Sequence, residues 1–120
     1  MTIHVRGGLT VREIAEITNG NIVNPAEVSI KHITTDSRDV PSGALFIAIR
    51  GERFDGNEYL GSAFEKGAVC ALAERVPAGV KGCVIVVKDT RLALGQLAKA
   101  YKEKIAPLTE SYLIYATMII

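Results

Sequence analysis

Apolar runs of strand length alternate with polar, glycine-containing segments along this chain. Ala44–Ile49 is a continuous apolar run, which is typical of a strand buried on both faces. Ala68–Ala73 and Cys83–Val87 have the same character and predict two further buried strands. Val28–Ile33 alternates imperfectly, and Ile22–Val23 is shorter still. The pattern therefore predicts a sheet of short, mostly buried strands.

Helical spacing appears between several of these runs. Thr10–Glu13 is a capping box that opens a first helix, and we expect Gly20 to supply its left-handed end. A second helix is predicted to begin with Asp55 or Asn57 as its cap and to end at Gly67. Each helix presents one apolar face, as helices that pack on a sheet do.

The order of these elements indicates the fold class. Strand, helix and strand from residue 44 to residue 73 predict a βαβ unit with parallel strands. A third, long helix is expected from Asp89 or Thr90 to about Ile105. The chain is therefore predicted to be α/β, with a small mixed sheet, one βαβ unit and about three helices.

Two polar loops flank the central apolar strand. We expect Thr34–Arg38 to return beside that strand as an antiparallel neighbour, through a turn at Pro41–Gly43. Such a return would collect a hydroxyl, a guanidinium, a carboxylate, a bare backbone and an amide at one end of the sheet. These groups belong to Ser37, Arg38, Asp55, Gly56 and Asn57. The set suits a ligand that carries both phosphate and a heterocycle.

Each loop also has a simpler interpretation. The fork of Arg38 suits bidentate phosphate contact, but a surface pair with Asp36 or Asp39 would explain it equally. Gly51–Asn57 precedes a predicted helix start, where backbone N–H groups favour an anion. A glycine-rich turn with a capping residue is the alternative. The loop lacks the spacing of a dinucleotide fingerprint and of a nucleoside-triphosphate phosphate loop.

Composition narrows the class of protein. With 120 residues, 48% of them hydrophobic and 22% charged, one soluble domain is expected. A net charge of +1 gives no electrostatic reason to expect nucleic acid or a membrane as partner. Cys70 and Cys83 lie in apolar runs, so we expect buried, inert thiols in a reducing cytoplasm. His4 and His32 have no metal-ligand spacing, and no metal site is expected.

Three blocks of sequence occur in order: Thr35–Arg38, Pro41–Gly56 and Val87–Ala98. Together they resemble the amino-terminal domain of the Mur ligases of peptidoglycan synthesis, over about residues 8 to 107. The residues at Arg53–Gly56 and Asp89–Leu92 favour the family member that adds a dipeptide over the one that adds diaminopimelate or lysine.

The resemblance implies a function in two parts. In this family the amino-terminal domain holds the UDP part of a UDP-N-acetylmuramoyl peptide, and further domains bind ATP with Mg²⁺ and the incoming amine. Ser37 and Arg38 are then expected to contact the uridine diphosphate. The loop expected to close around the uracil or its ribose consists of Gly51, Arg53, Phe54, Asp55, Gly56 and Asn57. We expect no catalytic residue in this chain, which would be an inactive fragment of an ATP-dependent, amide-forming ligase.

The end of the chain departs from the family pattern. A phosphate loop would follow Pro107 in the family, whereas residues 108–120 form a mostly apolar tail. We therefore expect a substrate-binding domain over residues 1–107 and an atypical tail over 108–120. Residues 110–120 are a candidate surface for self-association. A non-catalytic interaction module that has kept the fold and lost the ligand is the alternative from a different functional class.

Overall fold

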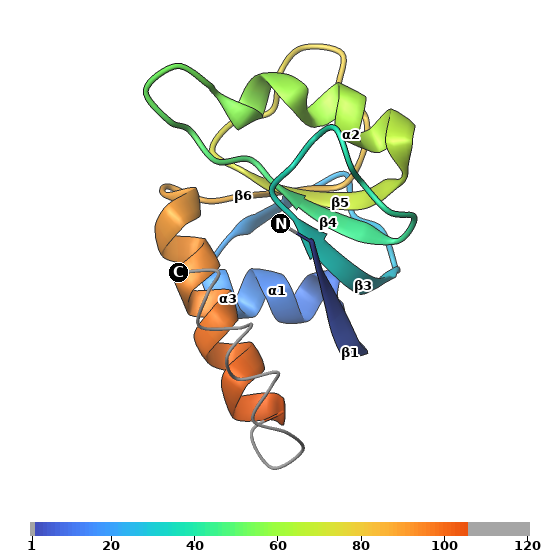
Figure 1. The fold of residues 1–120 in the computed structure, drawn as a ribbon, viewed down its shortest axis with the longest axis vertical. Helices are drawn as coiled ribbons and strands as arrows, with labels where there is room; N and C mark the ends of the chain where they lie inside the picture. The colour runs from blue at the N-terminus through green and yellow to red at the C-terminus, as the bar shows by residue number, and fades with distance from the viewer. Residues whose placement is uncertain (1, 106–120) are drawn as a thin grey trace.

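A six-stranded mixed sheet with helices on both faces forms the molecule (Figure 1). The computed structural model describes residues 2–105. Within them the strands are β1 (Thr2–Thr10), β2 (Asn21–Val23), β3 (Ser29–Thr34), β4 (Ala44–Ile47), β5 (Ala68–Ala73) and β6 (Val84–Val86). The helices are α1 (Val11–Thr18), α2 (Leu60–Lys66), which a 3₁₀ turn, η1 (Gly56–Tyr59), precedes, and α3 (Thr90–Ile105). The predicted α/β class is confirmed.

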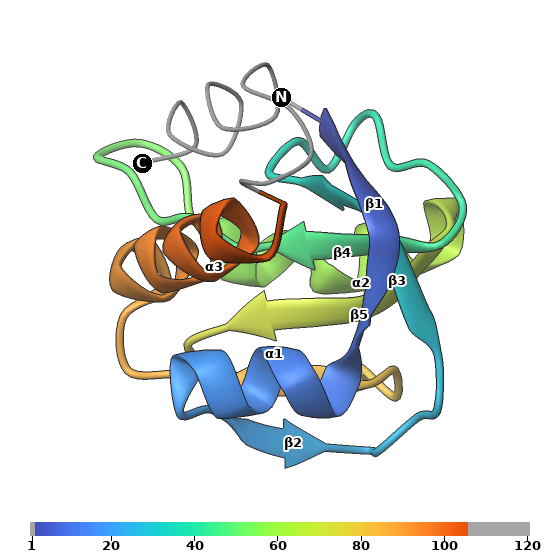
Figure 2. The same ribbon diagram turned by 90° about the horizontal axis from the view of Figure 1, so that it is seen from below.

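The sheet separates two apolar cores. Helices α1 and α3 cover one face and α2 covers the other (Figures 1 and 2). Branched and aromatic side chains such as Ile14, Leu72 and Tyr101 fill the first core. Alanines of β4, β5 and α2 pack around Phe46 in the second. Every residue of β4 is buried, as the continuous apolar run predicted.

The sheet order is β1-β3-β4-β5-β6-β2, and its four central strands are parallel. The predicted βαβ unit β4-α2-β5 is confirmed. The predicted antiparallel return of Thr34–Arg38 is wrong, because β3 itself pairs with β4 in parallel. The chain recrosses the sheet in the loop 35–43, and Val40 of that loop is buried in the α2-side core. This burial favours a crossing over the face of the sheet instead of strand pairing.

Helix α1 begins as predicted and ends one residue earlier than expected. Thr10 and Glu13 form both hydrogen bonds of the capping box. The left-handed residue at its end is Asn19, with φ of 55°, so the prediction of Gly20 is wrong. Asparagine tolerates this conformation better than most residues. Gly20 instead packs its Cα against the side chains of Ile85 and Val87, leaving no room for a Cβ.

Strand β1 was not expected from the sequence. Its alternation of buried and exposed residues breaks at Gly7 and Gly8, both of which have positive φ. The register with β3 shifts at this irregularity, between His4 and Leu9. The hydroxyl of Tyr101 on α3 fixes the strand, because it accepts from Arg6 N and donates to the carbonyl of His4.

The remaining helices match the sequence pattern. The Asp55 side chain caps η1, and Gly67 ends α2. Asp89 Oδ1 accepts from the backbone N–H groups of Arg91 and Leu92 at the start of α3. No helix within residues 2–105 is long and apolar enough to cross a membrane. The tail 108–120 lies outside the described residues.

Candidate functional site

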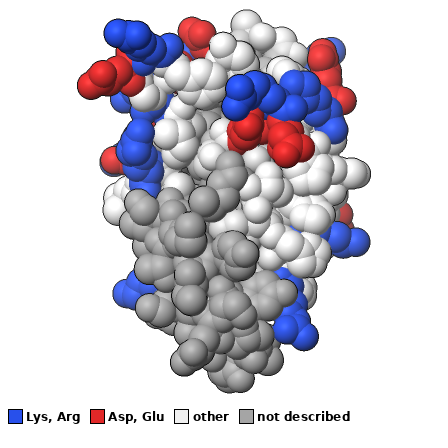
Figure 3. All heavy atoms as spheres, in the orientation of Figure 1, with Lys and Arg blue, Asp and Glu red and all other residues white. Residues whose placement is uncertain are grey.

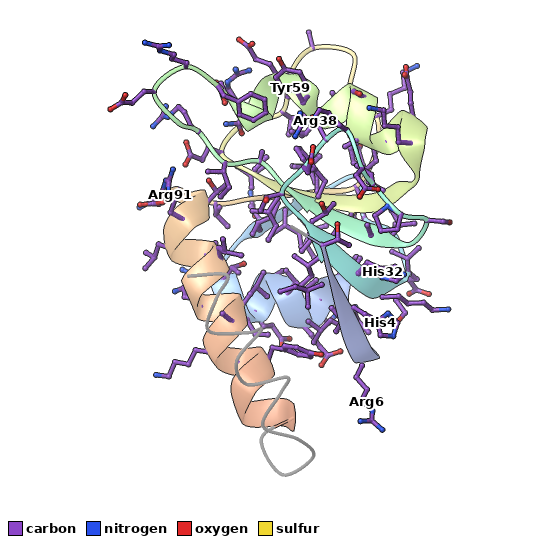
Figure 4. All side chains as sticks on the ribbon, viewed as in Figure 1. His4, Arg6, His32, Arg38, Tyr59 and Arg91 are labelled. Carbon is purple, nitrogen blue, oxygen red and sulfur yellow. The ribbon has the colours of Figure 1, made fainter. Side chains whose placement is uncertain are left out.

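A groove of about 500 Å³ lies at the edge of the sheet where β3 and β4 end. Parallel strands end at the same edge, so the loop after β3 and the loop after β4 meet there. The meeting that we expected from an antiparallel hairpin thus arises through a parallel pair. The lining residues are Thr35, Asp36, Ser37, Arg38, Phe54 and Tyr59. Figure 4 shows Arg38 and Tyr59 near each other at this edge.

Hydrogen bonds within the loop after β3 fix its shape. Thr34 Oγ1 accepts from the backbone N–H of Asp36 at 3.1 Å. Asp36 Oδ1 then accepts from both the backbone N–H and Nε of Arg38, at 2.9 and 3.0 Å. The side chain of Arg38 remains 87% exposed, so its guanidinium is held in place and still open to an incoming anion.

The Asp36–Arg38 contact has an electrostatic signature. Hydrogen bonds from the Arg38 side chain and backbone lower the pKa of Asp36 to about 2. Arg38 also donates from Nε to Asp36 Oδ1 and from Nη2 to Asp36 Oδ2, at 3.0 and 3.2 Å, so the surface pair that the sequence left open as an alternative exists. It does not use all of the guanidinium donors, because an arginine carries five N–H groups in one plane.

Ser37 is buried between these two residues and is only 5% exposed. Its carbonyl oxygen accepts from Nζ of Lys66, the last residue of α2, at 2.9 Å. The lysine ties the loop after β3 to the helix on the same face of the sheet. Ser37 therefore belongs to the wall of the groove.

The loop after β4 is a small hairpin. Arg50 and Asp55 form an isolated antiparallel bridge, and Gly51 N donates to the carbonyl of Phe54 at 2.6 Å. Gly51 and Arg53 are exposed at this turn. The ring of Phe54 stacks on Tyr59, with centroids 4.8 Å apart and planes inclined by 17°. The two rings are 43% and 40% exposed and form a flat apolar surface at the groove.

Sequence reasoning did not name three of the lining residues as site residues: Thr35, Asp36 and Tyr59. Tyr59 follows the predicted ligand loop by two residues and lies at the end of η1. Phe54 and Tyr59 lie five residues apart in the sequence, on either side of the predicted helix start. This spacing could have predicted that the two rings form one surface.

Asp55, Gly56 and Asn57 use their polar and backbone groups within the protein. Asp55 Oδ1 accepts from N and Nδ2 of Asn57, at 3.0 and 2.7 Å. Asn57 is 2% exposed, and its Oδ1 accepts from the backbone N–H of Glu74 at 2.9 Å. At Gly56 an added Cβ would lie 2.7 Å from Ile49 N. These three residues fix the hairpin onto the ends of β4 and β5.

Arginines from other elements surround this scaffold. The hydrogen bonds from Asn57, and then Arg75, lower the pKa of Asp55. Arg75 lies 3.0 Å from the Asp55 carboxylate and also faces Glu58. Arg50 approaches Glu74, which accepts from N and Oγ1 of Thr90 at the start of α3. Figure 3 shows positive and negative side chains mixed along the upper part of the face in view.

The two cysteines lie inside the larger core and away from the groove. Both are buried and form no disulfide, and Cys70 Sγ on β5 donates to Cys83 Sγ just before β6 at 3.7 Å. Burial, followed by the neighbouring Cys83, raises the pKa of the Cys70 thiol. Among residues 2–105 no three His, Cys, Asp or Glu side chains cluster as a metal site would require.

A second groove, of about 530 Å³, lies between the start of α1 and residues 22–29. Arg12 and Glu27 are the two charged residues of its lining, and no aromatic side chain lines it. The groove after β3 and β4 combines an exposed guanidinium with stacked rings. That combination can bind an anion and a flat ring together.

Comparison with known families matches residues 29–102 to a family described as "Mur ligase family, catalytic domain". A UDP-N-acetylmuramoyl-tripeptide--D-alanyl-D-alanine ligase of Haemophilus influenzae is 38% identical over 101 residues, which are 84% of this chain and 22% of that protein. A UDP-N-acetylmuramoyl-L-alanyl-D-glutamate--2,6-diaminopimelate ligase of Parabacteroides distasonis is 46% identical over 76 residues, or 62% of this chain and 16% of that protein.

Among solved structures, MurF from Acinetobacter baumannii matches with a TM-score of 0.74 and 38% identity. The match covers 85% of this chain and 22% of that one. The chain thus spans about a fifth of the length of the relatives that it matches over most of its own length.

Proposed function

Because this chain belongs to the Mur ligase family, we propose that it is the amino-terminal, UDP-binding domain of a UDP-N-acetylmuramoyl-tripeptide--D-alanyl-D-alanine ligase. Its ligand would be the UDP part of a UDP-N-acetylmuramoyl peptide. The observation that carries the proposal is the groove after β3 and β4, where an exposed guanidinium lies beside two stacked aromatic rings.

The chemistry of the lining divides the roles. Arg38 would contact the diphosphate, because its fork matches phosphate oxygens and its side chain is open to solvent. Phe54 and Tyr59 would contact the flat uracil ring. Ser37, Gly51 and Arg53 would complete the contacts from the two loops.

Asp55, Gly56 and Asn57 would act on the ligand through the shape of the hairpin. Their side chains and close backbone contacts are engaged within the protein. The substrate-binding loop would therefore consist of an open part, residues 51–54, and a fixed part, residues 55–57.

The ATP-dependent step of the family would use residues beyond those described. No phosphate loop of the form G-x-x-x-x-G-K-[ST] occurs in the 120 residues. No metal cluster of three acidic, histidine or cysteine side chains occurs in residues 2–105 either. The residues present do not fit ATP with Mg²⁺, and the domain alone would bind substrate without forming a bond.

Isothermal titration with UDP-N-acetylmuramoyl tripeptide tests this function. Replacing Arg38→Ala should weaken binding by about tenfold or more, because it removes a charge-assisted contact. Arg12→Ala, which alters an exposed arginine of the other groove, should leave binding unchanged. The absence of binding at millimolar ligand, or equal affinity in Arg38→Ala, would contradict the proposal.

The member that adds diaminopimelate or lysine is the second candidate. The 46% identity to a diaminopimelate ligase over 76 residues favours it locally. The longer match to the dipeptide-adding enzymes, over 84% of the chain, favours the first candidate. The genes next to the coding sequence would separate them, because the UDP part that this domain would bind is common to both substrates and its binding does not distinguish the two enzymes.

A non-catalytic interaction module is the candidate from another class. The sequence feature that suggests this candidate is the apolar stretch 110–120, which would support self-association. Light scattering on the chain with and without these residues tests it. A monomer in both cases would contradict self-association through the tail, whereas a dimer that depends on the tail would support the interaction module.

A further inference from the structure

Glu74 directly follows β5 and contacts three separate segments of the chain. Its backbone N–H donates to Asn57 Oδ1 at 2.9 Å. Its Oε2 accepts from N and Oγ1 of Thr90, the first residue of α3, at 3.1 and 3.3 Å. Its Oε1 lies 3.6 Å from Nη2 of Arg50. One carboxylate oxygen therefore faces the base of the hairpin after β4, and the other faces the start of α3.

The base of the hairpin is also held directly from α3. Arg91 Nη2 donates to the carbonyl of Arg50 at 3.4 Å, and Arg50 forms the bridge with Asp55 that closes the hairpin. Figures 1 and 2 show the hairpin beside the start of α3, and Figure 4 shows Arg91 away from Arg38 and Tyr59. Within residues 2–105, none of the groove lining comes from α3. The start of α3 therefore supports the hairpin without contributing to the groove.

This arrangement links the aromatic surface of the groove to α3. Phe54 belongs to the same hairpin, where its carbonyl accepts from Gly51 N, and its ring stacks on Tyr59. A shift of the hairpin base would move the ring of Phe54 off Tyr59. We propose, on the basis of the proposed UDP function, that Glu74 is a positioning residue of the groove. It holds the hairpin against α3, and UDP in the groove in turn holds the start of α3 in place.

The role requires a carboxylate at this position. The side chain of Glu74 is 19% exposed, so its contacts lie largely out of solvent, where hydrogen bonds to a charged group are strong. The N–H groups at the start of a helix also favour a negative charge. A glutamine has the same shape but only one side-chain oxygen, so it can accept from Thr90 or face Arg50 and cannot do both. Glu74→Gln therefore removes one connection and keeps the packing.

Titration of the full chain with UDP tests the positioning role. Glu74→Gln should weaken UDP binding by about fivefold, because one of the two connections is lost. Glu16→Gln, the same change at an exposed residue of α1, should leave the affinity unchanged. No binding by the unmodified chain would contradict the UDP function and this role together. Equal affinity in Glu74→Gln and the unmodified chain would overturn the role of Glu74 alone.

Arg50→Met is a second variant that acts from the hairpin side. The Arg50 side chain is 66% exposed, so the fold should be retained, and UDP affinity should fall by about threefold. In the double variant with Glu74→Gln, the loss should not exceed the larger single loss, because both changes remove the same contact. Unchanged affinity in Arg50→Met, or losses that multiply in the double variant, would overturn the link.

Hydrogen exchange at Thr90 gives a readout that a purely structural role would not change. The Thr90 N–H donates to Glu74, and Thr90 does not line the groove. With UDP at about ten times its Kd, exchange at Thr90 should slow by about fivefold or more, because opening there would release the hairpin and the ligand. The amide of Glu13, which Thr10 caps at the start of α1, should slow less. Equal slowing at both amides, or none at Thr90, would overturn the link.

Discussion

The two loops that form the groove differ in how their polar residues are used. After β3, the polar contacts are local, between Asp36 and Arg38, and the guanidinium stays 87% exposed. After β4, Asn57 is almost fully buried and links Asp55 to Glu74 at the end of β5. Similar residue types are therefore left open to solvent in one loop and used for internal hydrogen bonds in the other.

Polar residues in one candidate ligand loop can thus have different roles. The exposed fraction of a side chain and the number of its hydrogen-bond partners within the protein distinguish an open side chain from a structural one. Arg38 has one carboxylate partner, whereas the Asp55 carboxylate accepts from the backbone and side chain of Asn57 and from Arg75. Substitutions in the fixed part should therefore change folding, and substitutions in the open part should change binding alone.

The largest effect is expected at Gly56. An alanine Cβ there would meet Ile49 N, Ala48 Cα and Ile49 O at 2.7 to 2.9 Å. Because backbone atoms do not yield easily, Gly56→Ala should destabilise the chain by about 3 kcal/mol in urea unfolding. The matched control is Gly61→Ala in α2, where an added Cβ meets nothing within 4 Å. That change should be neutral or stabilising by up to about 1 kcal/mol. Equal stabilities for the two variants would contradict the scaffold role.

The next largest effect is expected for Asn57→Ala. This change should lower the free energy of unfolding by about 1–3 kcal/mol, because it leaves the backbone N–H of the half-buried Glu74 without its acceptor. Amide hydrogen exchange at Glu74 should accelerate in the same variant. Normal stability together with unchanged exchange at Glu74 would show that the asparagine is not a structural link.

Tyr59→Leu tests the open part of the groove. The exposed ring contributes a stacking surface, so affinity for the UDP ligand should fall about fivefold, or roughly 1 kcal/mol. Stability should change by less than about 0.5 kcal/mol, because the ring is 40% exposed. Titration calorimetry and urea unfolding on the same preparation check both. Unchanged affinity would remove Tyr59 from the binding surface.

The smallest effect concerns the titration of Asp36. Arg38 lowers the pKa of this carboxyl to about 2, below its ordinary 3.8. A lowered pKa in the folded state means a contribution to stability that is complete above about pH 4 and is lost as the pH falls toward 2. In Arg38→Ala, carboxyl NMR titration should show the pKa of Asp36 moving back toward 3.8. A value that stays near 2 would assign the shift to another cause.

Local patterns in the sequence predicted most elements and their bounds. Ala68–Ala73 is a strand as the apolar run indicated, and the capping box at Thr10 begins α1. The pairing between strands was harder to predict from the sequence. The turn residues 41–43 suggested a hairpin, and only the burial of Val40 on the α2 side shows why the chain crosses the sheet instead.

The candidate site was predicted in position more than in detail. Ser37, Arg38 and Phe54 meet in one groove, although the sequence pointed to the wrong strand direction. The internal use of Asn57 depends on Glu74, which lies 17 residues further along the chain. The contact between Glu74 and Thr90 likewise joins residues that lie 16 positions apart. Such long-range partners leave no periodic trace in sequence.

Amide NMR with UDP as ligand tests directly whether the groove after β3 and β4 binds UDP. The largest chemical-shift changes should fall on Ser37, Arg38, Phe54 and Tyr59, around that groove. The second groove, between the start of α1 and residues 22–29, is the internal comparison. Chemical-shift changes confined to that second groove, or none at millimolar UDP, would contradict UDP binding at the groove after β3 and β4.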